Sequence, residues 1–281
     1  MTTVRGLWRL FRFELPFTAG VCVVLGSLLA LGQFPTLAEI ALGFFSVFFI
    51  SAAALILNDY FDIESDRINA PHRPLPAGLV TEREVILLAA VVTMLGFVTG
   101  YLVSPAALLV VIVVWLVGFL YNWRFKRSGL PGNLMVSFSV GMTFIYGGIV
   151  VGRPWEALVW FFGVLVLLIN LGEEIAADAM DVAGDQLVAS RSLAVQLGSE
   201  RALCISAAIF LAVILISGLP FLFGWLDWIF LLPILLMDGV ILYATRKLLD
   251  ARIANRRVYI RWIYLSGLGM LLIFILISLI R

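Results

Sequence analysis

The sequence predicts an all-α integral membrane protein with nine membrane-spanning helices, and three observations lead to this fold class. Hydrophobic residues make up 63% of the 281 residues and charged residues only 13%, far from the average of soluble domains. The apolar residues gather in nine stretches, each near the ~17–25 residues that a helix needs to cross a bilayer. The basic residues between the stretches fall on alternate connections, as they do in a bundle that crosses a membrane repeatedly.

We place the spans in chain order at the apolar stretches. Tryptophans near several span ends are typical interface anchors, and the first stretch is long enough to be kept as a helix rather than cleaved as a signal peptide. Short odd-numbered connections and the lack of a fixed-period repeat favour one domain over residues 1–281. The nine expected spans are 15–32, 36–57, 83–103, 105–122, 132–152, 155–172, 201–218, 226–245 and 258–280.

Positive charges orient the predicted bundle. All but two of the 19 Lys and Arg residues lie in the N-terminal arm or in the second, fourth, sixth and eighth connections, the exceptions being Arg153 and Arg281. Because cytoplasmic loops carry such an excess, we expect a multi-pass protein of the cell membrane with its N-terminus and even-numbered connections in the cytoplasm. A net charge of +1 indicates no nucleic-acid partner, and no protein partner is implied.

A first acidic cluster follows the second span. Asn58, Asp62 and Asp66 recur at i, i+4 and i+8, so they line one face if the helix continues a little beyond residue 57, with Asp59 and Glu64 displaced from it. Like charges at this spacing repel one another, which makes the arrangement favourable when a cation is bound. The alternative interpretation is a solvated cap of a cytoplasmic loop.

A second acidic cluster follows the sixth span and repeats the pattern. Glu174, Asp178, Asp181 and Asp185 fall at i, i+4, i+7 and i+11, again one helical stripe. Hard oxygen ligands of this kind suit Mg²⁺, which is typically shared with substrate phosphates. The topology brings both clusters to one side of the membrane, where they could hold a diphosphate through bridging Mg²⁺. The single His72 lies beside prolines and is not expected to bind metal.

Basic residues on the same side would complete an anion site: Arg67 and Arg73 after the first cluster, Lys126 after the fourth span and Arg191 after the second cluster. Each is equally explained as a charge that orients the protein. A departing diphosphate develops negative charge, which metals and preorganised cations stabilise. The proline-rich loop 69–78 cannot continue the helix and could cover the site.

The motifs resemble those of the UbiA superfamily of intramembrane prenyltransferases. Asn58-Asp59-x-x-Asp62-x-x-x-Asp66, followed by Arg67, Asn69 and Arg73-Pro74, is similar to the family's first aspartate-rich motif. Asp178-x-x-Asp181-x-x-x-Asp185 with Arg191-Ser192 resembles the second motif, and Tyr121, Lys126, Gly132 and Asn133 resemble the segment after the fourth helix. The likeness extends over essentially the whole chain.

This resemblance implies a bundle around a central cavity open to the bilayer, where Mg²⁺ holds an isoprenyl diphosphate between the motifs. Loss of diphosphate would leave an allylic cation, shielded from water and attacked by an acceptor. Tyr121 would stabilise the cation through its ring, and Arg67, Arg73 and Lys126 would contact diphosphate, with Asn133 and Arg191 as further substrate-binding residues. The metal ligands implied are Asn58, Asp62, Asp66, Asp178, Asp181 and Asp185.

The acceptor stays open between two classes. The first motif looks most like archaeal-type enzymes that attach geranylgeranyl to geranylgeranylglyceryl phosphate, a step of ether-lipid synthesis, and this is the leading hypothesis. However, Glu173 and Ala177 stand where those enzymes carry Arg and Lys, and Arg12-Phe13-Glu14-Leu15-Pro16 replaces an Arg-Pro-x-Asn pattern. An aromatic acceptor of quinone synthesis is therefore the alternative. A cation-coupled transporter using Asp238 is a third hypothesis, although the acidic clusters lie at the membrane edge rather than its midplane.

Overall fold

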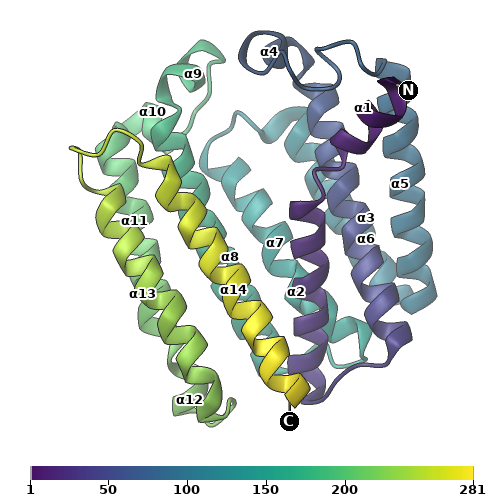
Figure 1. The fold of residues 1–281 in the computed structure, drawn as a ribbon, viewed down its shortest axis with the longest axis vertical. Helices are drawn as coiled ribbons and strands as arrows, with labels where there is room; N and C mark the ends of the chain where they lie inside the picture. The colour runs from purple at the N-terminus through teal and green to yellow at the C-terminus, as the bar shows by residue number, and fades with distance from the viewer. Residues whose placement is uncertain (1, 281) are drawn as a thin grey trace.

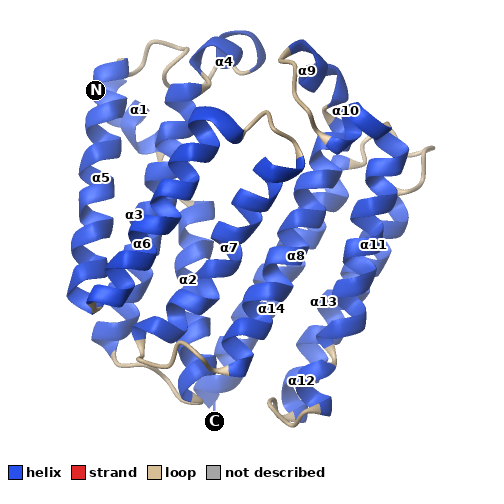
Figure 2. Cartoon of the chain, turned by 180° about the vertical axis from the view of Figure 1, so that it is seen from behind, coloured by secondary structure: helices blue, strands red, loops and turns tan. Residues whose placement is uncertain are grey.

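In a computed structural model, the residues described, 2–280, form helices joined by short connections and no strand (Figure 2). Met1, Arg281 and the side chains of Thr2, Thr3, Ser65 and Asn69 lie outside the description, so the prediction for Arg281 concerns a residue that is not described. Within the described part, nine helices are long and apolar enough to cross a membrane, which confirms the predicted fold class.

The nine spans follow the predicted order closely. They are α2 (Glu14–Leu31), α3 (Leu37–Phe61), α5 (Glu82–Val103), α6 (Pro105–Leu120) with the π-helical turn η1 (Tyr121–Phe125), α7 (Leu130–Val150), α8 (Ala157–Met180), α11 (Ser199–Ser217) with α12 (Leu219–Leu222), η2 (Trp228–Phe230) with α13 (Leu231–Leu248), and α14 (Arg257–Ile280). Four short helices complete the chain: α1 (Thr2–Leu10), α4 (Ile63–Asn69), α9 (Val182–Leu187) and α10 (Leu193–Leu197).

Two spans run further than their apolar stretches. α3 continues to Phe61 instead of ending at residue 57, and α8 continues to Met180 instead of ending at residue 172. The apolar pattern marks only the part of a helix inside hydrocarbon, whereas backbone hydrogen bonding carries the helix on into the interfacial region. Both acidic clusters consequently begin on helices that are anchored in the bundle.

The helices pack as two groups that share α2, α7 and α8. α3 packs against α5 and α2, α7 packs against α8 and α2, and α8 packs against α11. α14 lies between α13 and α2 and also contacts α8 (Figure 1). The short helices α1, α4, α9 and α10 all lie at one end of the bundle, so both acidic clusters share that end (Figure 1).

Close contact between α2 and α7 depends on glycines. A Cβ added to Gly26 would lie 2.5 Å from the carbonyl oxygen of Phe144, and one added to Gly147 would lie 2.4 Å from that of Val23. Small residues let two membrane helices approach to van der Waals contact of their backbones. This tight pair forms one wall of the central space of the bundle.

Candidate functional site

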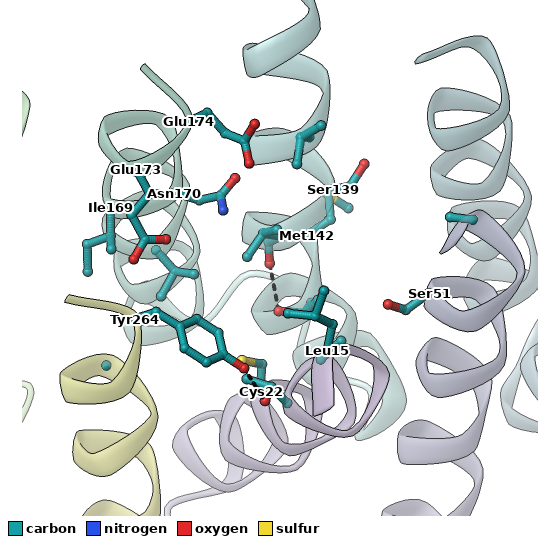
Figure 3. Close-up of a pocket in the computed structure, with 18 of the residues that line it drawn as sticks. Leu15, Cys22, Ser51, Ser139, Met142, Ile169, Asn170, Glu173, Glu174 and Tyr264 are labelled. Carbon is teal, nitrogen blue, oxygen red and sulfur yellow. Dashed lines mark hydrogen bonds between the residues drawn. The ribbon is translucent and has the colours of Figure 1, made fainter. Parts of the chain in front are cut away.

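A cavity of about 630 Å³ runs through the bundle and is lined by residues of α2, α3, α6, α7, α8, α13 and α14. Its walls are mostly aliphatic, with polar groups toward the end that carries the acidic clusters, among them Asn58, Tyr121 and Glu174. Figure 3 shows polar side chains of α8 and α14 extending into this space. The cavity is suited to an apolar chain whose polar head lies at the acidic end.

The first acidic motif, residues 58–66, is broken in its middle. α3 ends at Phe61, Asp62 has φ −92° and ψ 2°, and α4 starts at Ile63. The uninterrupted helical stripe expected from the spacing is therefore wrong beyond Asp62. The non-helical ψ at Asp62 turns the chain, so Asp66 belongs to a separate short helix.

Every carboxylate of the first motif except that of the exposed Glu64 has a basic partner from another part of the chain. Arg12 pairs with the buried Asp59, and Lys126 pairs with Asp62. Arg73 lies 2.5 Å from an Asp66 oxygen and 3.6 Å from Asp59. These pairs tie the N-terminal arm, the proline-rich loop and the η1 segment to the end of α3.

Asn58 lies at the centre of a polar cluster beneath these pairs. With its amide oxygen turned to Lys126 Nζ at 2.8 Å, its nitrogen donates to Asp62 Oδ2 at 3.2 Å. In the other orientation of its amide, Asn58 Nδ2 donates to Asn122 Oδ1 at 2.9 Å, and Asn122 Nδ2 donates to the carbonyl oxygen of Ala54 at 3.0 Å. The η1 turn thus holds both Asn122 and Lys126 against the end of α3.

The second acidic motif, residues 178–185, is broken in the same way. α8 ends at Met180, Asp181 has φ −115° and ψ 14°, and α9 starts at Val182. Here too the expected continuous stripe is wrong beyond its first carboxylates. Asp178 accepts a hydrogen bond of 2.9 Å from the buried Asn133, and Asp181 pairs with Arg257 of α14.

The segment after η1 connects the two motifs. The backbone N–H of Arg191 donates to the carbonyl oxygen of Arg127 at 2.9 Å. Gly129, with φ +74°, sits so close that an added Cβ would lie 1.9 Å from the Arg191 carbonyl oxygen. Tyr121 lines the cavity together with Asn58 of the first motif and Glu174, which lies four residues before Asp178 of the second. Both motifs therefore lie at the same end of this cavity.

The predicted site residues divide into those the structure brings together and those it leaves outside. Asn58 and Tyr121 line the cavity, Asp62 and Lys126 contact each other and Asn58, Asn133 bonds to Asp178, and Arg73 pairs with Asp66. Arg67 and Arg191 are exposed side chains. Asp238 lies elsewhere, beside a second cavity of about 350 Å³ between α11 and α13.

The fit of this donor set to Mg²⁺ depends on its geometry and on its chemistry. Among the described residues, no three Asp, Glu, His or Cys side chains lie close enough together to hold an ion, so the metal ligands stay a prediction. The chemistry of the set nevertheless fits, because hard carboxylate oxygens dominate it. In addition, Asp185 Oδ2 is buried without a hydrogen-bond partner, as a ligand atom would be.

Several residues of the site were not singled out from the sequence. Arg12 and Arg257 counted only as orienting charges, yet they pair with Asp59 and Asp181. Asn122 was taken as the end of a span. A polar residue at the end of an apolar run, directly before Lys126, was the signal available for Asn122, whereas nothing local marks an arginine as the partner of a distant carboxylate.

The chain is similar to known proteins over most of its length. The model of the UbiA prenyltransferase family matches residues 19–268. The digeranylgeranylglyceryl phosphate synthase of Pyrococcus furiosus is 31% identical over 254 residues, 90% of each chain. A solved digeranylgeranylglyceryl phosphate synthase structure superposes with a TM-score of 0.81 at 26% identity over 100% of both chains. A UbiA homolog from Archaeoglobus fulgidus, bound to GPP and Mg²⁺, superposes with a TM-score of 0.66 at 18% identity. The superposition covers 96% of this chain and 95% of that chain.

Proposed function

Because the chain belongs to the UbiA prenyltransferase family, we propose that it transfers geranylgeranyl from its diphosphate to geranylgeranylglyceryl phosphate in ether-lipid synthesis. One observation carries the proposal: two acidic motifs, each where a membrane helix ends, lie at the same end of an apolar cavity of about 630 Å³. The relatives named digeranylgeranylglyceryl phosphate synthase support this acceptor. The family match over residues 19–268 supports treating 1–281 as one domain.

The proposal includes Mg²⁺ as the cofactor. Asn58, Asp62 and Asp66 of the first motif and Asp178, Asp181 and Asp185 of the second would hold it. When bound, Mg²⁺ neutralises charge on the diphosphate and so stabilises it as a leaving group. The bound Mg²⁺ and GPP of the Archaeoglobus fulgidus homolog support this assignment.

The basic side chains at the mouth would bind the diphosphate. Lys126 and Arg73 lie against motif carboxylates, and both would be available to diphosphate oxygens where metal held those carboxylates. Arg67 and Arg191, exposed at the same end, would bind its outer oxygens. Asn133 holds Asp178 in place through its 2.9 Å hydrogen bond.

Bond breaking would take place just inside the mouth. The ring of Tyr121, which lines the cavity, would stabilise the positive charge of the allylic carbon. The aliphatic walls exclude the water that would otherwise capture the cation. The basic connections at this end support the proposal that the N-terminus and the site are cytoplasmic.

The test is product formation by the purified protein in detergent or lipid with Mg²⁺ and labelled geranylgeranyl diphosphate. Geranylgeranylglyceryl phosphate is offered in one reaction, and 4-hydroxybenzoate-like or naphthoate acceptors in others. Transfer to the glyceryl phosphate is expected. Transfer only to an aromatic acceptor would move the chain to quinone synthesis, and no transfer to either class would contradict the proposal.

A further inference from the structure

A second carboxylate of α8, next to Glu174 in the chain, also lines the cavity. Glu173 of α8 lines the cavity, and its Oε1 atom is buried without a hydrogen-bond partner (Figure 3). A buried polar atom without a partner costs ~1–3 kcal/mol, more when it is charged. Such an atom in a substrate cavity is therefore expected to meet its partner on the substrate.

The cations that line the same cavity are taken by other carboxylates. Arg257 pairs with Asp181, and Arg261 lies 2.5 Å from Glu14. The amide of Asn170, whose oxygen accepts a hydrogen bond of 3.1 Å from Ser137, hydrogen-bonds to the Glu173 carboxyl group but leaves Oε1 without a partner. Among the described residues these cations are paired elsewhere, so the Oε1 atom of Glu173 lies at the cavity without a partner.

Glu173 also differs from its neighbour Glu174. Glu174 lies one turn below Asp178 on the same face of α8, because the two residues are four apart, and so belongs with the diphosphate end. Glu173 points about 100° away from that face. Figure 3 shows Glu173, together with Asn170 and Tyr264, extending into the cavity.

We propose that Glu173 is a catalytic residue that accepts a hydrogen bond from the acceptor's free hydroxyl and removes its proton during transfer. The proposal rests on the proposed function, since it needs a hydroxyl acceptor in this cavity. In this proposal the acceptor's hydroxyl binds at the cavity wall beside Glu173, and the diphosphate binds at the end of the cavity that carries the acidic motifs.

The step balances without a further reactant. The acceptor oxygen forms a bond to the first carbon of the geranylgeranyl group, and the bond from that carbon to the diphosphate oxygen breaks, with its electron pair leaving on the diphosphate. The hydroxyl proton passes to Glu173, which returns it to solvent after product release. General base catalysis of this kind contributes ~10²–10⁴-fold to a rate.

The test compares two reactions of the same variant. With geranylgeranylglyceryl phosphate as acceptor, Glu173→Gln is expected to lower transfer by about 100-fold or more. Acceptor-independent hydrolysis of geranylgeranyl diphosphate should stay within about 2-fold of wild type, since Glu173 does not act on bond breaking. Asp238→Asn, the same chemical change at a buried carboxyl beside the second cavity, should alter neither reaction.

A modified acceptor distinguishes removal of the acceptor's proton by Glu173 from a purely structural role of this side chain in the cavity wall. When the acceptor's free hydroxyl is replaced by a thiol, whose proton is lost far more readily, Glu173→Gln should transfer to it within about 10-fold of wild type. Equal losses in transfer and hydrolysis, or no rescue by the thiol, would overturn the role of Glu173. Failure of the wild type itself to use geranylgeranylglyceryl phosphate would instead overturn the proposed function, and this assignment with it.

Discussion

The first acidic motif at the end of α3 and the second at the end of α8 are built alike and differ in how their carboxylates are paired. Both are interrupted at a central aspartate, Asp62 or Asp181, and both continue in a short helix. In the first, the side chains of Asp59, Asp66 and Asp62 are 2%, 8% and 17% exposed, and each has a basic partner. In the second, Asp181 is 54% exposed and its partner Arg257 is 58% exposed.

This difference indicates a division of labour within one site. The first motif is held in position by contacts that the chain itself supplies, so its carboxylates are preorganised. The second motif has weaker restraints, because exposed ion pairs contribute only ~0–1 kcal/mol. We infer that the first motif forms the fixed half of the diphosphate site and that the second is held less firmly before the ligand binds.

The largest effect is expected when Asp62, the central carboxylate of the first motif, is removed. Asp62→Asn should lower prenyl transfer by about 10³-fold, because it weakens both the metal site and the positioning of Lys126. Diphosphate release from labelled substrate measures the loss. Glu64→Gln, the same kind of change at an exposed residue close by, serves as control and should retain most activity. Equal activities of the two variants would refute the site.

The charge opposite Asp62 comes next in expected effect. Lys126→Met should lower kcat by about 10²-fold, since a cation that binds the departing diphosphate stabilises the transition state. Lys126→Arg should restore part of the rate. Arg124→Met removes an exposed cation of the same π-helical turn and should change kcat little. Steady-state kinetics of these variants would contradict the assignment if Arg124 mattered as much as Lys126.

The free energy of unfolding, measured without substrate, compares the first and second motifs directly. Asp59→Asn should destabilise the protein by about 2–3 kcal/mol, less than for a fully buried pair because Arg12 and Arg73 are about one-third exposed. Asp181→Asn should cost about 0–1 kcal/mol, because its pair is exposed. Thermal unfolding in detergent gives both values. A larger loss for Asp181→Asn would reverse the proposed division of labour.

The sequence predicts the helices and most residues of this site, but not which basic residue pairs with which carboxylate. Nine apolar stretches and alternating basic connections are local properties, and the structure agrees with them. The breaks at Asp62 and Asp181 were not predicted, because a helical spacing of carboxylates says nothing about where the backbone turns. The partners Arg12 and Arg257 come from distant segments, so only the packed bundle brings them to Asp59 and Asp181.

The connection between the two halves gives a smaller, structural effect. Gly129→Ala should lower activity by about 10-fold, because a Cβ 1.9 Å from the Arg191 carbonyl oxygen, at φ +74°, pushes the segment after Lys126 away from the second motif. Gly269→Ala in α14, where an added Cβ meets nothing within 4 Å, is the matched control and should be neutral. Comparable losses in both variants would indicate a general packing effect rather than a link between the motifs.

The smallest effect is expected at Asp238, a carboxylate that belongs to neither half. It is 7% exposed, accepts a hydrogen bond of 2.7 Å from Ser217, and lines the second cavity rather than the one with the motifs. Asp238→Asn keeps an acceptor for Ser217 and should cost about 1 kcal/mol at most while leaving prenyl transfer unchanged. A protein that used this carboxylate for ion coupling would lose cation-driven transport in the same variant. Measuring both prenyl transfer and cation flux in proteoliposomes decides between the two, because an enzyme built on the paired motifs has no use for Asp238 beyond packing.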